Sequence, residues 1–595
     1  MKPGKTIRIG GASAFWGDSS VGPVQLVRQG RVQYLVFDYL AELTMSIMAA
    51  AQLKNPEAGY ATDFVSVAMR SVLPDIVTQG ICVVSNAGGI NPLACARALE
   101  ALAKEMGLSP RIAVVLGDDV MPLLPRIRGE GVSEMLSGRP LPDQVLSANA
   151  YLGALPVKAA LDAGAQIVIT GRCVDSAVTL GVLMHEFGWA EDDYDRLAAG
   201  SLAGHIIECG CQATGGLFTD WQQVPDWAHI GYPVIECASD GSFVVTKPEN
   251  TGGLVNPAVV TEQLLYEIGD PSSYRLPDVV CDFRGVSMVA QGEHRVEVRG
   301  ARGRAPSTQY KVSATYVDGY RCAAQLTIVG FDAAAKARRT GEAVLQRTRE
   351  LLQALGLGDY SASSIEILGA ESGYGPHAQA LAMREAVLRI AVTHRQKSAL
   401  ELFAREIAPA GTSWSPGTTG AGGGRSSVSP SIRQFAFLQE KSRVQVELVM
   451  AERRTPVAVP VGPGEAKAPP GPATVAAYTE GDDLVEVSLI HIAHGRSGDK
   501  GDISNVGIVA RRPEWLPLIR DQVTESTVAR WLAHLVQGPV RRYDLPGAHS
   551  LNFVCEQALG GGGMASLRND PLGKGMAQIL LALPVKVPAA WLREL

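Results

Sequence analysis

The sequence predicts an α/β fold: a large domain with a mixed or parallel sheet and an α+β extension, followed by a small ferredoxin-like α+β domain. The first half alternates short β-branched runs, Gly- or Asn-rich loops and helical patterns, which is typical of a parallel sheet covered on both faces. After about residue 275, apolar and polar residues alternate as in antiparallel strands. A Pro/Ala/Gly-rich segment over 455–480 then separates a last unit.

Length and composition narrow the class of protein. The chain has 595 residues, of which 46% are apolar and 19% charged, so several cores are expected and disorder is not. The net charge of -6 favours neither nucleic acid nor an anionic membrane surface as a partner. Nine cysteines lie mostly in apolar runs, as reduced buried thiols do. With no signal peptide and no apolar run of membrane-spanning length, we expect a cytoplasmic protein.

The large α/β domain is expected over residues 1–454. Its first half repeats the order strand, loop and helix, and the clearest cases are at 6–19, 81–106, 112–120 and 165–188. Ligands of such sheets bind at the carboxyl ends of the strands, where these loops lie. None of the loops reads GxGxxG, so we do not expect a dinucleotide site of that kind.

The α+β portion of this domain is expected over about 276–454. Turns are predicted at Gln291-Gly292 and Asp318-Gly319, where a glycine follows a polar residue. A helix is predicted over 336–357, and one or two more over 383–407, from their apolar spacing.

Three further segments complete the chain. Residues 411–435 read as a Gly-rich loop, and 455–480 as a Pro/Ala/Gly linker. Residues 481–595 show a strand, a turn, a second strand, two helices and a closing strand, which predicts the small α+β domain.

Residues 494–502, with the sequence HGRSGDKGD, concentrate polar groups in what reads as one tight turn. The glycines permit a nest of backbone N–H groups that binds an anion, and Arg496 and Lys500 add positive charge. Asp499 and His494 are candidates for acid/base work. The alternative is a rigid hairpin in which the acidic side chains cap amides and pair with the basic ones.

Four consecutive glycines occur within 558–575, ahead of Ser566, Arg568 and Lys574. Such a run carries a heavy entropic cost on folding, which suggests that a ligand or another chain approaches the backbone closely. A mobile hairpin loop is the alternative.

His205, Glu208, Cys209 and Cys211 lie close together in an apolar, glycine-rich stretch. The spacing lacks the CxxC knuckle and a second ligand pair, so we expect no metal. His205 and Glu208 are interpreted as acid/base candidates, or as polar groups satisfied in the core.

Two further sites follow apolar strands. Arg172 and Asp175 come directly after the strand that ends near Thr170, which is the expected ligand edge of the sheet. Arg172 can bind a carboxylate or phosphate of a ligand. The alternative is that Arg172 and Asp175 pair with each other and cap the following helix. Lys247 precedes a glycine pair and is a candidate anion ligand, and Asp38 stands as a single carboxylate near a strand end.

Long motifs in order along nearly the whole chain resemble the acyclic terpene utilisation (AtuA-type) family. They include FDYLAELTM, VSNAGGINPLACA, ITGRCVDSA, AAGSLAGHIIECGCQATGG, VTEQLLYEIGDP and HGRSGDKGDISNVGIVARR. The resemblance implies the family's large α/β domain and its carboxy-terminal ferredoxin-like domain. It also implies a place in the breakdown of acyclic terpenes, which proceeds through branched acyl-CoA thioesters.

We therefore expect a cytoplasmic lyase or hydratase that acts on an acyl-CoA or a related acid, with a non-catalytic subunit of a catabolic complex as the alternative. No cofactor is expected apart from coenzyme A as part of the substrate, and the protein is expected to form a homo-oligomer. The catalytic candidates are Asp499, His494, Glu208 and His205. The candidate substrate ligands are Arg496, Lys500, Asn505, Arg172, Asp175 and Lys247.

Overall fold

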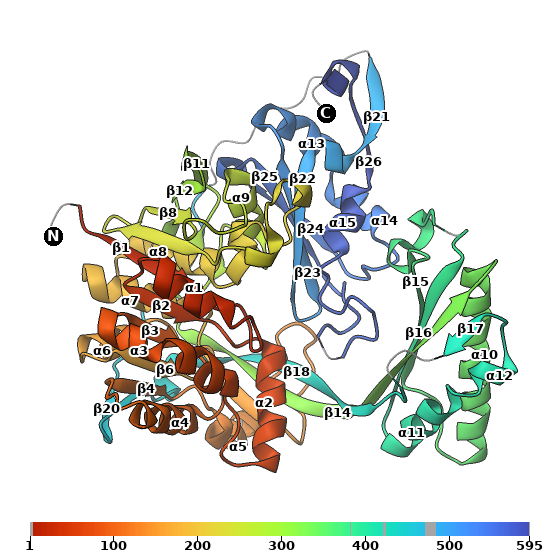
Figure 1. The fold of residues 1–595 in the computed structure, drawn as a ribbon, viewed down its shortest axis with the longest axis horizontal. Helices are drawn as coiled ribbons and strands as arrows, with labels where there is room; N and C mark the ends of the chain where they lie inside the picture. The colour runs from red at the N-terminus through yellow and green to blue at the C-terminus, as the bar shows by residue number, and fades with distance from the viewer. Residues whose placement is uncertain (1–3, 381, 421–423, 471–482, 564, 594–595) are drawn as a thin grey trace.

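A computed structural model describes residues 4–380, 382–420, 424–470, 483–563 and 565–593 of the chain. It confirms the predicted fold class: an α/β domain with an α+β extension, and a small α+β domain that follows them (Figure 1). No helix among these residues is long and apolar enough to cross a membrane.

The largest sheet is mixed and has 11 strands. Its parallel centre consists, in spatial order, of β1 (Thr6–Gly11), β2 (Tyr34–Phe37), β3 (Cys82–Ser85), β6 (Ile167–Thr170) and β4 (Ile112–Leu116). Antiparallel strands extend it at both ends: β7 (Val234–Ala238), β8 (Phe243–Thr246), β12 (Arg295–Arg299) and β11 (Ser287–Gly292) beyond β1, and β19 (Glu447–Met450) and β20 (Arg453–Pro456) beyond β4. The parallel strands read as short apolar runs because both of their faces are buried.

Helices cover both faces of this sheet. One face packs against α1 (Val21–Gln29), α2 (Glu42–Lys54), α3 (Arg70–Gln79) and α4 (Pro92–Glu105). The other face packs against α6 (Leu155–Asp162), α7 (Ala177–Phe187) and α8 (Tyr194–Ile207). Neighbouring residues of one strand lie in the cores on opposite faces of the sheet. Leu35 packs in the core under α1–α4, and Val36 packs in the core under α6–α8, because successive side chains of a strand point to opposite faces.

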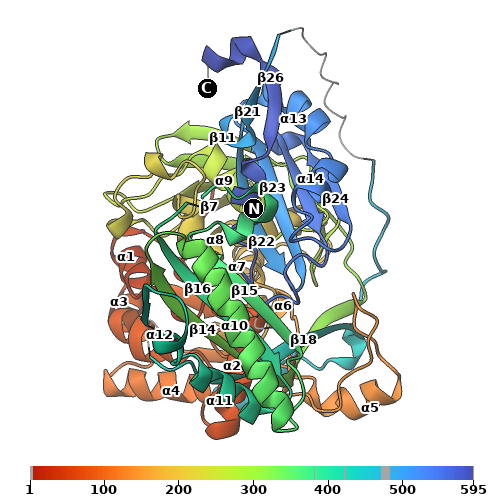
Figure 2. The ribbon, with the colours of Figure 1, turned by 90° about the vertical axis from the view of Figure 1, so that its right-hand side faces the viewer.

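The α+β extension is built on one long strand, β14 (Gln309–Val329). Its first half pairs with β5 (Ser147–Ala150) and β18 (Val428–Glu440), and its second half with β16 (Glu385–His394) and β17 (Thr418–Gly420), while β15 (Ala362–Leu368) pairs with β16. The helices α10 (Ala333–Ala354), α11 (Lys397–Glu406) and α12 (Ala410–Ser413) belong to the same lobe, and Figure 2 shows α10 lying lengthwise across its strands. β14 thus joins this lobe to the main domain.

The helix predicted over 336–357 is confirmed as α10, and of the one or two helices expected over 383–407 one is found, α11, whereas the turn predicted at 318–319 is wrong. Residues 385–394 form the strand β16 and only the following segment is helical, because alternate side chains such as Leu388 and Ile390 face one core. No turn interrupts β14 at 318–319, since both flanks of the strand are paired. Gly319, at φ +74, instead accommodates an irregularity in the pairing with β18.

Two smaller expectations also differ from the structure. The hairpin between β11 and β12 turns at Glu293 and His294 rather than at 291–292. The Gly-rich segment 411–435 contains α12, β17 and the first part of β18 in its described residues, and 421–423 lie outside them.

The small domain has a four-stranded antiparallel sheet in the order β22 (Ala493–Lys500), β23 (Ile503–Ala510), β25 (Ser550–Cys555) and β24 (Val540–Leu545). Its helices are α13 (Leu516–Gln522), α14 (Glu525–Trp531) and α15 (Met576–Leu581), and β21 (Leu484–Ser488) pairs with β26 (Pro584–Pro588). Of the expected linker, 457–470 contain no helix or strand, and 471–480 lie outside the described residues.

The small domain contacts the large one through α9 (Pro257–Leu265), which packs against β22 and β23 (Figure 1). The remaining large-domain elements with regular structure include α5 (Leu124–Gly129), β9 (Tyr274–Arg275), β10 (Val280–Asp282) and β13 (Arg302–Arg304). The contact along α9 brings residues from both domains to the candidate site.

Candidate functional site

Polar side chains gather at the carboxyl ends of the parallel strands, where ligands of such sheets bind. Asp38 follows β2 and Asn86 follows β3, and both are buried. Asn86 Nδ2 donates to Asp38 Oδ1 at 2.5 Å. Burial, reinforced by the nearby charges of Asp175 and Glu208, raises the pKa of Asp38 well above its usual range. Asp38 therefore favours the protonated form.

Arg172 follows β6 at the same edge and is also buried. Its Nη1 donates to Leu40 O at 3.0 Å and to Asp175 Oδ1 at 2.7 Å, and its guanidinium lies 4.2 Å from the centroid of the Tyr151 ring. Asp118, at the end of β4, accepts the Arg172 backbone N–H at 2.8 Å. These contacts hold Arg172 and Asp175 together as a pair.

His205 and Glu208 form a buried acid/base pair at the end of α8. His205 Nδ1 lies 2.9 Å from Glu208 Oε1, while Nε2 lies 3.1 Å from both Gln263 O and Leu264 O. Since carbonyl oxygens only accept, the geometry assigns a proton to Nε2. The bond between Nδ1 and Oε1 then holds one shared proton, which sits on the imidazole or on the carboxyl.

The surroundings of this pair favour retention of the shared proton. Burial raises the pKa of Glu208, although His205 opposes the rise, and the charge of Asp175 adds to it. Burial alone would lower the pKa of His205, but the Glu208 carboxylate outweighs it and the pKa is raised. The Glu208 side chain is 12% exposed against 2% for His205. Glu208 is thus the member of the pair with access to a ligand.

Two lysines of the small domain surround a carboxylate of the large one. Lys500 Nζ lies 2.9 Å from Glu267 Oε2, and Lys574 Nζ lies 3.8 Å from Glu267 Oε1 and 3.5 Å from Asp499 Oδ1. Lys574 also donates to the Tyr266 hydroxyl. Burial alone would raise the pKa of Glu267, but the two lysines outweigh it and the pKa is lowered. The lysine side chains are 43% and 39% exposed, so both are accessible to an anionic ligand.

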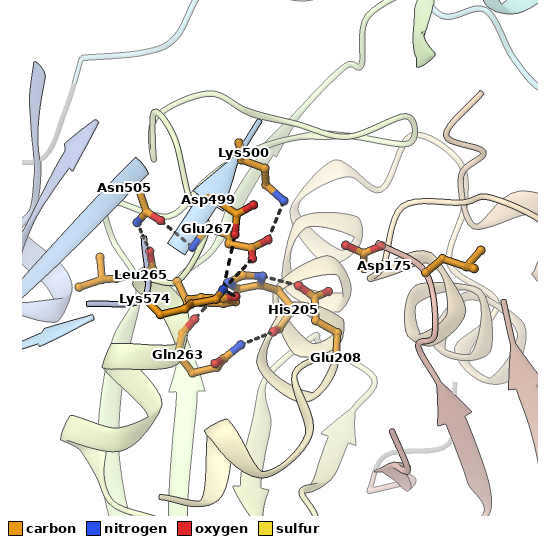
Figure 3. Close-up of polar contacts among 12 residues, drawn as sticks. Asp175, His205, Glu208, Gln263, Leu265, Glu267, Asp499, Lys500, Asn505 and Lys574 are labelled. Atoms are coloured by element: carbon orange, nitrogen blue, oxygen red, sulfur yellow. Dashed lines mark hydrogen bonds and ion pairs between the residues drawn. The ribbon is translucent and has the colours of Figure 1, made fainter. Parts of the chain in front are cut away.

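The lysine cluster and the acid/base pair belong to one site. The charge of Lys500 acts on the pKa of His205 and of Glu208, and the ring of Tyr274 lies 6.2 Å from that of His205. Figure 3 shows the Glu208 carboxyl between His205 and Asp175, with Lys500 above the pair. The site combines a shared proton, carboxylates and accessible cations from two domains.

Two further candidates from the small domain, His494 and Arg496, also contact the large domain. His494 Nε2 lies 3.1 Å from Asp220 Oδ2, and Arg511 binds the same carboxylate through two nitrogens at 2.6 Å each. Burial lowers the pKa of His494. The Nη1 of Arg496 donates to Leu217 O at 3.1 Å. The guanidinium of Arg496 also lies 5.1 Å from the centroid of the Tyr266 ring, which Lys574 contacts, so Arg496 lies beside the lysine cluster, whereas His494 is directed to Asp220.

Lys247 lies apart from the site as well. It follows β8, is buried, and donates through Nζ to Thr251 O at 2.6 Å. Burial lowers the pKa of Lys247, and the negative charge of Glu293 partly opposes this effect.

Asn505 is buried with all of its amide contacts directed to protein groups. Its Oδ1 accepts the Glu267 backbone N–H at 2.9 Å, and its Nδ2 donates to Leu265 O at 2.6 Å and to Asn552 Oδ1 at 3.0 Å. It lies beside the lysine cluster and binds the segment that carries Glu267 (Figure 3).

The expectation of an anion-binding nest at 494–502 is wrong. Residues 493–500 form the strand β22, whose backbone pairs with β23, and only Gly501 in this segment has a positive φ, at +65. Gly498 instead allows close domain contact, since a Cβ there would lie 2.6 Å from Tyr266 Cε2.

The four-glycine run is explained by the chain itself. Gly562 packs against the turn of the β22–β23 hairpin, because a Cβ on it would lie 1.9 Å from Gly501 O. Asp502 Oδ1 accepts the N–H groups of Leu559 at 3.0 Å and Gly561 at 2.8 Å. The loop therefore supports the hairpin that carries Lys500.

Several residues of the site were missed from the sequence: Glu267, Tyr266, Tyr274, Asn86, Asp118 and Asn552. The signal for Glu267 was weak, a single acid after an apolar helix, while the two asparagines follow or lie in apolar strands. Among the described residues, no group of three or more His, Cys, Asp or Glu side chains is placed to hold a metal ion.

Comparison with protein families gives two matches in order along the chain. The model of the acyclic terpene utilisation family protein AtuA matches residues 7–450, and that of the AtuA ferredoxin-like domain matches residues 487–586. The comparisons with curated proteins and with solved structures gave no match.

Proposed function

The chain belongs to the acyclic terpene utilisation family AtuA, and from this premise we propose that it is an enzyme acting on an acyl-CoA thioester or a comparable carboxylated metabolite. Family membership indicates a role in acyclic terpene utilisation. The proposed reaction is hydration or dehydration of the acyl chain, or cleavage of a carbon–carbon bond in it.

The observation that carries this proposal is the proton shared by His205 and Glu208 beside the accessible lysines. Hydration of an α,β-unsaturated thioester needs a base that takes a proton from water and a cation that stabilises the enolate oxygen. Retro-aldol cleavage needs the same two parts, with the base acting on a hydroxyl group. In both reactions the proton returns to the enolate carbon.

The roles follow from the geometry. Glu208 exchanges protons with the substrate, because it is the more exposed partner, and His205 stores the proton in the buried bond. Lys500 and Lys574 attract the anionic part of the substrate and the charge that develops on the thioester oxygen. The charge of Asp175, which follows the strand β6, raises the proton affinity of Glu208.

The exposed side of α2 offers apolar side chains to a hydrocarbon chain. The helix begins four residues after Asp38, and Leu40 O accepts from Arg172. Its sequence is apolar on several sides, and it leaves Ile47 44% exposed and Leu53 74% exposed. A branched hydrocarbon chain that extends from the site along this helix would bury those side chains.

A thermal-shift panel tests the proposal. It contains CoA, branched and straight acyl-CoAs, the matching free acids, and nicotinamide and flavin nucleotides. Ligands that bind the folded state raise the melting temperature as their concentration exceeds Kd. We expect a shift with branched acyl-CoA that is lost in Lys500→Met and kept in Lys586→Met, a matched exposed lysine on β26 of the same domain.

Turnover is then measured with a branched enoyl-CoA, by following the absorbance of the conjugated thioester. We expect loss of that absorbance with the wild type and none with Glu208→Gln. Stabilisation by free acids alone would move the substrate away from thioesters. The absence of any shift, with an intact fold, would contradict the enzyme and favour a non-catalytic subunit.

A further inference from the structure

Residues 263–269 connect the acid/base pair with the small domain. At one end of this segment, Gln263 O and Leu264 O each lie 3.1 Å from His205 Nε2. The residues that follow are bound by side chains of the small domain. A single stretch of backbone therefore contacts the buried imidazole and the domain interface.

Asn505, on β23, binds the middle of the segment. It accepts the N–H of Glu267 at 2.9 Å and donates to Leu265 O at 2.6 Å (Figure 3). Both bonds are with backbone groups, so they restrain the path of the chain rather than one side chain.

Asn552, on the neighbouring strand β25, binds the far end. Its Nδ2 donates to Ile268 O at 2.8 Å and to Gly269 O at 2.7 Å, and its Oδ1 accepts from Asn505 at 3.0 Å. The side chain is fully buried. The two asparagines thus act as one clamp on the segment.

The segment is held in a conformation that it would not adopt freely. Glu267 has φ +59, in the left-handed region that side chains other than glycine rarely occupy. Gly507 lets β23 approach, since a Cβ there would lie 2.5 Å from Leu265 Cβ. Strained backbone of this kind persists only where its surroundings determine it, and here the surroundings are the small domain.

We propose that Asn505 and Asn552 are positioning residues that hold two carbonyl oxygens on His205 Nε2, and so keep the mobile proton of the pair between Nδ1 and Glu208. This rests on the proposed function, because it assumes that the pair performs acid/base work. The small domain then contributes more than its lysines: its docking determines which nitrogen of the imidazole is protonated.

The physical reason is the cost of an unpaired buried donor. If the carbonyl groups of Gln263 and Leu264 moved away, the Nε2–H would be a buried donor without acceptors, which destabilises that tautomer. The imidazole would then keep its only proton on Nδ1, facing the Glu208 carboxylate, and the extra proton would be lost at a lower pH. The other groups that act on His205 are Lys500, which disfavours the imidazolium, and the Tyr274 ring.

The test is nitrogen and proton NMR of the full-length chain labelled at histidine, with His205 assigned by its absence in His205→Asn. In the wild type we expect a protonated Nε2 and a strongly deshielded proton between Nδ1 and Glu208. Asn552→Leu, close in volume but without donors, should move the imidazole to the neutral form and lower its titration midpoint.

Arg511→Gln is the matched control, because it removes an interdomain contact with Asp220 and leaves 263–269 untouched. Its His205 signals should be those of the wild type. Asn505→Ser provides a second clamp variant if Asn552→Leu does not fold, as judged by circular dichroism. A wild-type imidazole without a proton on Nε2, or unchanged His205 signals in a folded clamp variant, would overturn the proposal.

This result can be separated from failure of the proposed function, since it reads the position of a proton without any substrate. Where turnover is found, the clamp variants should lower kcat and leave KM for the acyl-CoA nearly unchanged. A substitution that only loosened the fold would lower the melting temperature without moving the His205 titration.

Discussion

Replacement of Glu208 by glutamine tests the buried pair most directly. In the wild type, Glu208 Oε1 lies 2.9 Å from His205 Nδ1, and the imidazole is almost completely buried. A hydrogen bond to a charged group contributes about 1.5–3 kcal/mol. Loss of the carboxylate therefore reduces the ratio of imidazolium to imidazole by about 10- to 150-fold at a given pH, since 1.4 kcal/mol corresponds to a tenfold change.

The sign of the effect follows from the opposing causes. Burial lowers the pKa of His205, and Glu208 opposes this more strongly than the hydrogen bond to Leu264 O does, so in Glu208→Gln the pKa should fall from above 6.5 to below it. In the wild type, the raised pKa stabilises the fold below pH 6.5, and the contribution is lost as the pH rises through the folded value. In the variant, whose folded pKa lies below 6.5, the stability should instead increase as the pH rises from the folded value to 6.5.

The assay is an NMR titration of His205 between pH 5 and 9, with urea unfolding at the same pH values to compare the slopes. His185→Asn is a control, because His185 pairs with Asp162 at a more exposed position, 29% accessible. A His205 midpoint that stays above 6.5 in Glu208→Gln would show that the carboxylate does not hold the proton, and would refute the reasoning.

Three further predictions concern the domain interface, the four-glycine loop and one cysteine thiol. Hydrogen bonds from Arg511, and to a lesser extent from His494, hold the pKa of Asp220 well below its usual range. The ion pair should therefore be complete above the ordinary pKa of an aspartate and weaken only as the pH falls through the lowered pKa. Asp220→Asn should lower the free energy of unfolding in urea by about 1.5–3 kcal/mol at pH 7, and equal stability would contradict the ion pair. Gly562→Ala should lower the melting temperature by an amount equivalent to about 1–3 kcal/mol, because its Cβ would overlap Gly501 O, whereas an unchanged melting point would mean that the loop does not support the hairpin. Cys211 is partly buried, and this burial raises its pKa to about 12, so mass spectrometry should find it unalkylated by iodoacetamide in the native state at neutral pH. Rapid alkylation would contradict the raised pKa.

The amino-acid pattern predicted much of the large domain because its signals are local. The apolar run before Arg172 indicated a buried parallel strand, and the rule for ligand edges then placed Arg172 and Asp175 at its carboxyl end. His205 and Glu208 lie three residues apart on one helix, so their pairing needed only helical geometry. In each case the contact depends on residues near one another along the chain.

Local reasoning failed where two distant segments share a contact. The glycines of 494–502 indicated a tight turn that binds an anion, yet Gly498 lies in a strand and has no side chain because Tyr266 packs on it. Gly562 in the four-glycine run has the same explanation, since the hairpin turn at Gly501 approaches it, and all four glycines of the run also have positive φ. A glycine in the sequence shows that space or backbone freedom is required, but not which group requires it.

The sequence by itself determined the family, the fold class and the types of chemical group available, because these follow from motifs and from periodicities of two and 3.6 residues. Only the tertiary structure decided which of those groups form the site. Glu267 lies between lysines that follow it by 233 and 307 positions (500 − 267 and 574 − 267), and His494 is directed to Asp220 instead of Glu208. These contacts form only when the two domains dock. Docking depends on the shapes of the two surfaces and on buried hydrogen bonds, and neither can be predicted from a local sequence pattern.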